Sequence, residues 1–230
     1  EGMSFLDFLF PKFCVHCKKF GSYVCDDCFA TISFFDGGFC VVCQKAAIGG
    51  LTHPLCKKRY TIDGVFSSLV YQGITKRLVY RFKYKPYLTS LQGILDDFFY
   101  EGLCQKEAFY RILQEDVVFV PVPLHASRLR MRGYNQSELL AKGLAKRFSL
   151  SFFDCLQRIK KTHTQVGLTK EEREKNIKDA FVVKKLKSLP VAVFLVDDVV
   201  TSGATLKEAA KVLKKAGVEK VWGVTLSHGN

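Results

Sequence analysis

Two adjacent carboxylates, Asp197 and Asp198, end the apolar run of the segment FLVDDVVTSGATL, residues 194–206. Their like charges repel each other unless a hydroxyl-rich or positively charged group binds beside them. Small and hydroxylated residues follow directly and lead into a helical pattern, whose free backbone N–H groups attract a phosphate. We therefore expect a sugar phosphate, with its hydroxyls on the two carboxylates and its phosphate on Thr201, Ser202, Gly203, Ala204 and Thr205.

Neither of the common glycine-rich nucleotide loops, GxxxxGK[ST] and GxGxxG, occurs in the chain. The folds that carry those loops therefore do not explain the segment. The alternative for Asp198 is a carboxylate that only stabilises the start of the following helix.

Cysteines are concentrated at the start of the chain, where seven of the nine lie within the first 56 residues. A C-x-x-C pair lets one tight turn aim both thiolates at one ion, and two pairs supply the four ligands of a structural zinc. Disulfides are the alternative, but seven is an odd number and the first residues lack the pattern of a secretory signal. We expect zinc bound by Cys14, Cys17, Cys25, Cys28, Cys40, Cys43 and Cys56.

The pairing of these ligands remains open at this point. The pairs at 14–17 and 25–28 could close one site, with the second pair opening a helix that continues to the glycines at 37–38. The pair at 14–17 could instead join the pair at 40–43. In the first arrangement the later cysteines need a fourth ligand, which is His53 or, in a site that has lost its metal, no residue at all.

Strand and helix patterns alternate after residue 60. The Val- and Phe-rich segments 64–71, 116–123, 191–198 and 220–226 predict strands buried on both faces, with helices at 74–85, 88–103, 136–148 and 204–216. Thr169 and Glu172 have capping-box spacing and predict a further short helix, and Gly217 stands where the last helix should end. The fold class is therefore α/β, a mostly parallel sheet over 61–230 preceded by a zinc-binding cysteine module over 3–60.

Positive charge is also unevenly distributed, because residues 57–93 hold eight basic residues and one acidic residue. The stretch YQGITKRLVYRFKYKPY, residues 71–87, interleaves these cations with aromatic rings, a combination that binds single-stranded nucleic acid. The alternative is an amphipathic helix whose aromatic side chains face the core. The candidate nucleic-acid-binding residues are Lys76, Arg77, Arg81, Lys83, Tyr84 and Lys85.

The segment VFLVDDVVTSGAT resembles the 5-phosphoribosyl-1-pyrophosphate (PRPP) motif of type I phosphoribosyltransferases. The whole chain is similar to the ComF/ComFC family of bacterial competence proteins, which join a cysteine zinc module to a domain of that type. The likeness includes RMRGYNQSELLA, residues 130–141, and RIKKTHTQVGLTKEEREKN, residues 158–176. Two departures are Ser202, where a second Thr is common, and Arg59, which stands where the family usually has a cysteine.

The resemblance implies that Asp197 and Asp198 are the catalytic residues and bind the ribose hydroxyls, directly or through Mg²⁺. It implies that residues 201–205 hold the 5-phosphate and that pyrophosphate lies near residues 120–123. The cations for pyrophosphate would be Lys83, Arg130, Arg132 or Arg158. The alternative for Arg130 and Arg132 is a pair of solvated surface charges.

Two functions follow from these expectations. The first is a natural-transformation protein that handles incoming single-stranded DNA in the cytoplasm and carries a binding site for PRPP or ribose 5-phosphate. The second is an active phosphoribosyltransferase, which displaces pyrophosphate through an oxocarbenium-like ribose toward an unknown acceptor. Competence and recombination proteins are the expected partners, and the apolar segment SFLDFLFPKF, residues 4–13, predicts peripheral contact with the inner membrane face.

Overall fold

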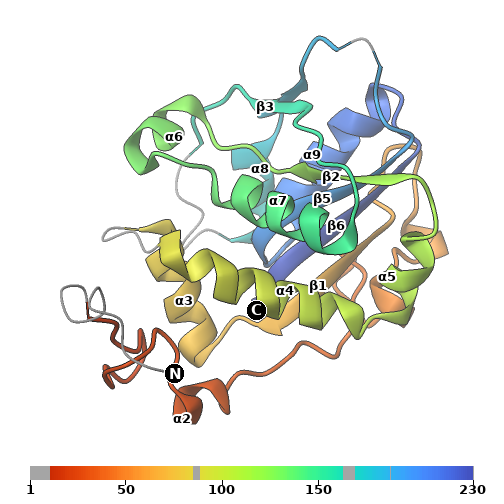
Figure 1. Ribbon diagram of the computed structural model, residues 1–230. Coiled ribbons are helices and arrows are strands. Elements are labelled where there is room, and N and C mark those ends of the chain that lie inside the picture. Colours follow the sequence, from red (N-terminus) through yellow and green to blue (C-terminus); the bar gives the residue numbers. More distant parts are fainter. Residues whose placement is uncertain (1–10, 85–88, 163–168, 187, 230) are drawn as a thin grey trace.

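The computed structural model describes residues 11–84, 89–162, 169–186 and 188–229 (Figure 1). Within them a four-stranded sheet has the strand order β1-β6-β5-β2, and every neighbouring pair is parallel. The predicted α/β class with a mostly parallel sheet is confirmed. The strands are β1 (Gly64–Val70), β2 (Val117–Pro121), β5 (Ala192–Val200) and β6 (Lys220–His228).

Helices cover both faces of the sheet. One face packs against α3 (Gly73–Lys83), α4 (Gln92–Cys104) and α7 (Gln136–Phe148), and the other packs against α9 (Ala204–Lys215). Successive strand residues alternate between these two cores, as expected for strands buried on both sides. Phe194 and Val196 of β5 thus belong to the first core, and Val193 and Leu195 belong to the second.

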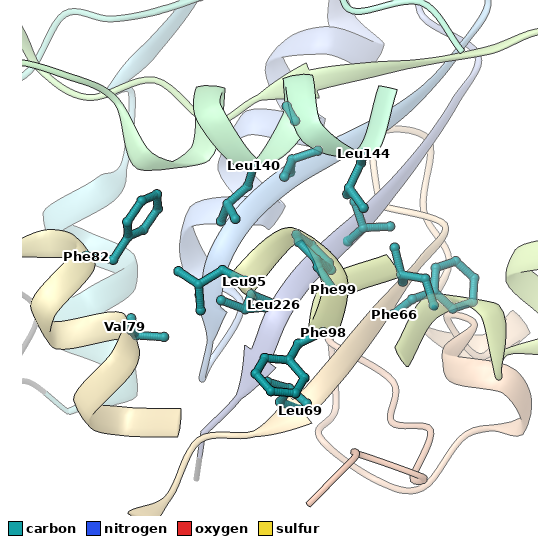
Figure 2. Packing of buried hydrophobic residues seen from close by; sticks show 14 of the residues in the cluster. Phe66, Leu69, Val79, Phe82, Leu95, Phe98, Phe99, Leu140, Leu144 and Leu226 are labelled. Carbon is teal, nitrogen blue, oxygen red and sulfur yellow. The ribbon is translucent and has the colours of Figure 1, made fainter. Parts of the chain in front are cut away.

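Large apolar side chains fill the first core (Figure 2). Phe99 of α4 and Leu140 of α7 are fully buried, together with Leu226 of β6. Helix α4 approaches β1 closely at Gly102, where the hydroxyl of Ser68 donates a hydrogen bond to the carbonyl of Phe99. This layer fixes the positions of α3 and α7 relative to the carboxyl end of β5.

Shorter elements complete the described chain. An antiparallel pair of strands, β3 and β4, lies outside the main sheet, and the predicted capping box of Thr169 and Glu172 opens α8. Gly217 follows the last helix in the left-handed region, as predicted. The elements are α2 (Asp26–Phe29), η1 (Ile48–Gly50), η2 (Pro54–Cys56), η3 (Thr89–Leu91), α5 (Glu107–Ile112), α6 (Ala126–Arg132), β3 (Leu156–Arg158), α8 (Lys170–Ile177) and β4 (Phe181–Val183).

The predicted helix after Cys25 was wrong in length. Helix α2 ends at Phe29, and residues 33–35 run extended beside β1, where the Phe35 N–H donates to the Ser68 carbonyl at 2.8 Å. Pairing with an edge strand has therefore overridden the local helical pattern. The predicted strand 191–198 ended too early, because β5 continues past both acids to Val200.

No helix in the described ranges is long and apolar enough to cross a bilayer. The apolar segment 4–13, on which the predicted membrane contact rests, lies outside those ranges except for residues 11–13.

Two glycines of α4 allow a matched test of the packing between α4 and β1. A Cβ at Gly102 would overlap the Cβ of Ser68 and lie 2.7 Å from its Cα, whereas a Cβ at Gly93 meets nothing within 4 Å. We expect Gly102→Ala to lower the free energy of unfolding by about 1–3 kcal/mol, because the helix must move away from the strand. Gly93→Ala should leave the free energy unchanged or raise it by less than about 1 kcal/mol. Urea unfolding of both variants checks this, and equal stabilities would contradict the close approach.

Candidate functional site

A cation from α3 neutralises one of the two acids. The Nζ of Lys83, the last residue of α3, lies 2.7 Å from Oδ1 of Asp198, whose side chain is only 5% exposed. Burial alone would lower the pKa of Lys83, but the negative charge of Asp198 outweighs it and raises that pKa. Lys83 was expected as a cation for pyrophosphate, and in the structure its ammonium group is held in an ion pair with Asp198.

The other acid has different partners. Oδ1 of Asp197 accepts hydrogen bonds from the Ser137 hydroxyl at 3.0 Å and from the Asp198 backbone N–H at 2.9 Å. Burial, together with the nearby charge of Asp198, raises the pKa of Asp197 to about 7. Near neutral pH this carboxyl can therefore accept a hydrogen bond from a hydroxyl or, when protonated, donate one.

Residues 201–205, here called the 201–205 loop, comprise the connection from β5 to α9 and the first two residues of that helix. Gly203 has a φ of 68°, and helix α9 begins at the next residue without a side-chain cap. The first N–H groups of a helix have no partner within the helix, so this end of α9 presents donors and a partial positive charge. From α8, Arg173 donates from Nη1 to the Thr201 hydroxyl at 2.5 Å, which brings a guanidinium group to the loop.

Two of the three predicted arginines are buried close to this end of the sheet. Arg132 donates to the Gln136 side chain, and its guanidinium lies 5.6 Å from the centre of the Tyr84 ring. Arg158 donates to the Thr162 hydroxyl. Burial, with the charge of Arg128, lowers the pKa of Arg158 to about 10. The alternative of solvated surface charge is wrong for Arg132, whereas Arg130 is exposed on α6.

Several buried polar atoms of these side chains lack a protein partner. In the described ranges, neither Nε of Arg132 nor Nε of Arg158 has a hydrogen-bond partner, and Oδ2 of Asp198 has none either. An unpaired buried donor or acceptor is destabilising by about 1–3 kcal/mol. Such atoms fit a site that a ligand completes, with donors for an anion and an acceptor for a hydroxyl or a metal ion.

Some contacts of this site were not predicted. Ser137 lies within the RMRGYNQSELLA segment, where Asn135 caps α7 and accepts from the Ser137 backbone N–H. The Asn-x-Ser spacing before an apolar helix was the available signal for that cap. Nothing in the local sequence indicates that the Ser137 hydroxyl reaches Asp197, which is 60 residues away. Residues 163–168 of the second resembling segment lie outside the described ranges.

Helix α3 fits both interpretations of the basic-aromatic stretch 71–87, an amphipathic helix and a surface for nucleic acid. Its apolar face, with Leu78 and Phe82, is buried as expected for an amphipathic helix. The opposite face exposes Lys76 and Arg77 together with Tyr80, whose ring is 4.9 Å from that of the exposed Tyr84. Arg81 is partly exposed, and Lys85 lies outside the described ranges.

The cysteines form two groups. Cys14, Cys17, Cys25 and Cys28 offer sulfur atoms that all lie within 4.8 Å of one another. The pairing of 14–17 with 25–28 is therefore the observed one, and the alternative pairing with 40–43 was wrong. Thiolates about 2.3 Å from a tetrahedral zinc lie roughly 3.7 Å from each other, so this group has the size of a structural zinc site.

The second group contains Cys40, Cys43, His53 and Cys56, again with all ligand atoms within 4.8 Å. The His53 ring lies between two partners, with Nε2 2.9 Å from the Ala46 carbonyl and Nδ1 3.4 Å from the Cys43 sulfur. A ring that donates from Nε2 to a carbonyl leaves Nδ1 free to bind an ion. His53 is therefore placed where the fourth ligand that the sequence left open would bind, and Arg59 lies against the ring of Tyr60 instead.

The chain matches two family models. The phosphoribosyl transferase domain matches residues 135–229, and the double zinc ribbon domain matches residues 5–58. The first range contains Ser137, both acids and the loop before α9. The second contains both cysteine groups, and together they support the predicted structural zinc.

The chain is also similar to curated proteins. It is 43% identical over 110 residues to Competence protein F of Haemophilus influenzae, covering 46% of this chain and 48% of that protein. It is 37% identical over 106 residues to DNA utilization protein YhgH of Escherichia coli K12, covering 44% and 45%. These matches span about half the length of the relatives. Over 211 residues it is 24% identical to Competence protein ComFC of Streptococcus pneumoniae, covering 87% and 85%. The predicted resemblance to competence proteins is confirmed.

The raised pKa of Asp197 predicts a pH-dependent stability. An unfolded Asp has a pKa near 3.9, so between about pH 4 and pH 7 the folded protein binds the proton that the unfolded chain has lost. The contribution of this carboxyl to the free energy of unfolding must therefore fall as the pH rises through that window. Asp197→Asn removes this contribution. As the pH rises through this window, the free energy of unfolding of the variant should therefore increase relative to the wild type by at most about 1.4 kcal/mol per pH unit.

Urea unfolding at several pH values between about pH 4 and pH 8 measures this difference. Asp116→Asn, which removes an exposed carboxylate, is the matched control and should run parallel to the wild type. Parallel curves for Asp197→Asn would contradict the raised pKa.

Proposed function

We propose that this chain, which joins a double zinc ribbon to a phosphoribosyl transferase domain and is similar to competence proteins, acts in natural transformation. It binds PRPP or ribose 5-phosphate at the carboxyl end of β5 and single-stranded DNA on the exposed face of α3. The observation that carries the proposal is the position of residues 201–205 at the start of α9, immediately after the strand that holds the two acids.

The 5-phosphate of the ligand would bind at this loop. In a parallel sheet, ligands bind beyond the carboxyl ends of the strands. The backbone N–H groups at the start of α9 supply donors aligned with the helix dipole, and Thr201, Ser202 and Thr205 supply hydroxyls. Arg173, already within hydrogen-bond distance of Thr201, adds positive charge beside this anion.

The ribose hydroxyls would bind at the acids. Asp197 at its raised pKa can accept a hydrogen bond from a hydroxyl or, when protonated, donate one, and Oδ2 of Asp198 gains the partner that the described residues do not give it. Magnesium fits the same oxygens, because it prefers carboxylate ligands and substrate oxygens. When bound, the ion would neutralise part of the negative charge of the pyrophosphate group. Lys83 supplies one positive charge to Asp198 from within the protein.

Pyrophosphate would bind to the buried arginines. Arg132 and Arg158 each have an unpaired Nε donor in the described ranges. A guanidinium can hold phosphate oxygens with two parallel hydrogen bonds, and burial strengthens these bonds by excluding water. The same cations would stabilise pyrophosphate as a leaving group, so active phosphoribosyl transfer is the second candidate function.

Calorimetric titration with PRPP and magnesium tests the ribose-phosphate site. Asp198→Asn keeps the shape of the side chain but removes its charge, and we expect affinity to fall at least tenfold, about the contribution of one hydrogen bond to a charged group. Asp96→Asn is the matched control, because Asp96 is also a buried acid but lies between α4 and α7. Equal affinities for both variants would contradict the proposal. Release of pyrophosphate from PRPP in the presence of DNA or a nucleobase would identify an active transferase.

The exposed face of α3 supports the DNA-binding part of the proposal. Lys76 and Arg77 give positive charge for phosphates, and the adjacent rings of Tyr80 and Tyr84 offer flat surfaces on which bases can stack. Arg132 against Tyr84 extends the positive charge toward the ribose-phosphate site. We place this activity in the cytoplasm, where thiols stay reduced and competence and recombination proteins are the proposed partners.

Fluorescence anisotropy with single-stranded and duplex DNA at several salt concentrations tests this part. The double variant Lys76→Gln/Arg77→Gln should weaken binding to every sequence and flatten the salt slope by about 1.4, because each lost phosphate contact on a single strand contributes about 0.7. Tyr80→Ala/Tyr84→Ala should reduce the preference for single strands. The control Lys215→Gln/Lys220→Gln removes two exposed charges far from α3, one at the end of α9 and one at the start of β6. An equal effect of the control would contradict an α3 interface.

A further inference from the structure

The second zinc ribbon packs directly against the loop that precedes α9. Val41, which lies between two ligands of the second cysteine group, is fully buried. A Cβ on Gly203 would overlap Cγ2 of Val41, so the ribbon leaves no room for a side chain at position 203. Glycine at position 203 is therefore required both by its φ of 68° and by the presence of Val41.

Further contacts join the same two regions. The side-chain amide of Gln44 donates to the Val41 carbonyl at 2.7 Å and to the Ser202 carbonyl at 3.4 Å. The ring of Phe39 lies 4.4 Å from the ring of His228, the last residue of β6. Residues 39–44, here called the second knuckle, thus pack against residues 201–203.

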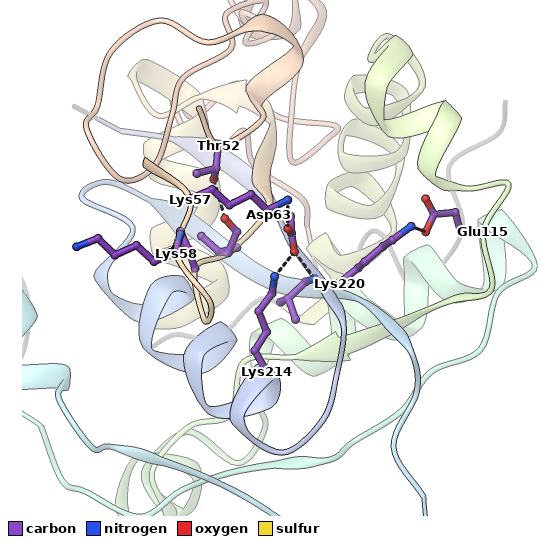
Figure 3. A network of polar contacts seen from close by, with 10 residues as sticks. Thr52, Lys57, Lys58, Asp63, Glu115, Lys214 and Lys220 are labelled. Atoms are coloured by element: carbon purple, nitrogen blue, oxygen red, sulfur yellow. Dashed lines mark hydrogen bonds and ion pairs between the residues drawn. The ribbon is translucent and has the colours of Figure 1, made fainter. Parts of the chain in front are cut away.

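The chain after the second knuckle is anchored at the opposite end of the strands, where β1 begins (Figure 3). The Asp63 carboxylate accepts from Lys57 at 2.8 Å and from Lys214 of α9 at 2.6 Å, while the backbone N–H of Thr52 donates to the backbone carbonyl of Asp63. Burial raises the pKa of Asp63, but the hydrogen bonds from Lys214 and Lys57 outweigh it and leave that pKa lowered. This end of the ribbon is therefore held by charge pairs that need no metal ion.

The turn of the second knuckle is shaped by two backbone hydrogen bonds and one residue in the left-handed region. Its turn is closed by the Gln44 N–H on the Cys40 carbonyl at 2.7 Å and by the Cys40 N–H on the Lys45 carbonyl at 2.9 Å. Gln44 has a φ of 64°, which costs a non-glycine residue free energy. A metal ion on Cys40 and Cys43 would fix the backbone on both sides of Val41, and His53 and Cys56 would tie it to the anchored segment.

We propose that the second knuckle positions the phosphate-binding loop, with Val41 and Gln44 as positioning residues, so that metal binding at the second cysteine group sets the affinity for a ribose phosphate. This proposal rests on the proposed function of the 201–205 loop. The first cysteine group provides a comparison within the same chain, because Cys14, Val15 and Cys28 belong to the core on the opposite face of the sheet. Removing the metal there should leave residues 201–203 in place.

The test compares Cys43→Ser with Cys17→Ser, which each remove one ligand from one group. Metal analysis should show that each variant loses a zinc equivalent. Calorimetry with ribose 5-phosphate should show affinity reduced about tenfold or more in Cys43→Ser and unchanged in Cys17→Ser, since about one well-placed hydrogen bond is at stake. Hydrogen exchange should be faster at the amides of residues 202–206 in Cys43→Ser alone.

Val41→Ala covers the case in which Cys43→Ser does not fold. It keeps all four ligands, so zinc content should be unchanged while exchange at residues 202–206 increases and affinity falls. Loss of zinc from Cys43→Ser with wild-type affinity and wild-type exchange would overturn the inference. If the wild type itself binds neither ribose 5-phosphate nor PRPP, the proposed function fails. The exchange data still decide whether the second knuckle orders the loop.

Discussion

Two adjacent carboxylates repel each other, and this repulsion determines how the site is built around Asp197 and Asp198. Both acids lie near the carboxyl end of β5, and each has a partner from a different helix on the same face of the sheet. Asp198 pairs with Lys83 at the end of α3, and Asp197 accepts from Ser137 near the start of α7. The result is an asymmetric pair in which Asp198 has a neutralising cation and Asp197 has a pKa raised to about 7.

The topology brings the remaining groups to the same edge. All strands of the main sheet are parallel, so their carboxyl ends, the start of α9 and the end of α3 meet there. The buried Arg132 and Arg158 have donors without partners in the described part of the chain, which is consistent with an anion-binding role. The zinc ribbon contributes to this edge as well, since Val41 lies directly behind Gly203. Two regions that match separate family models therefore meet at this end of the sheet.

Local patterns predicted the parts of this structure that depend on neighbouring residues. The C-x-x-C spacing identified the ligand pairs, and the order of apolar runs predicted the parallel sheet. Contacts between distant residues could not be predicted in this way: Ser137 with Asp197 and Val41 with Gly203 leave no periodic signal. Long-range contacts also explain the wrong helix after Cys25, because residues 33–35 pair with β1 instead. The family resemblance indicated Arg132 and Arg158, but only the fold shows that they are buried.

A crystal structure of the protein with PRPP and magnesium tests the central claim most directly. We expect the 5-phosphate on the backbone N–H groups of residues 202–205 and the ribose hydroxyls within hydrogen-bond distance of Asp197 and Asp198. We also expect the pyrophosphate to engage the Nε donors of Arg132 and Arg158. Density for PRPP only on the exposed face of α3, or at the acids with the 5-phosphate directed away from α9, would contradict this account.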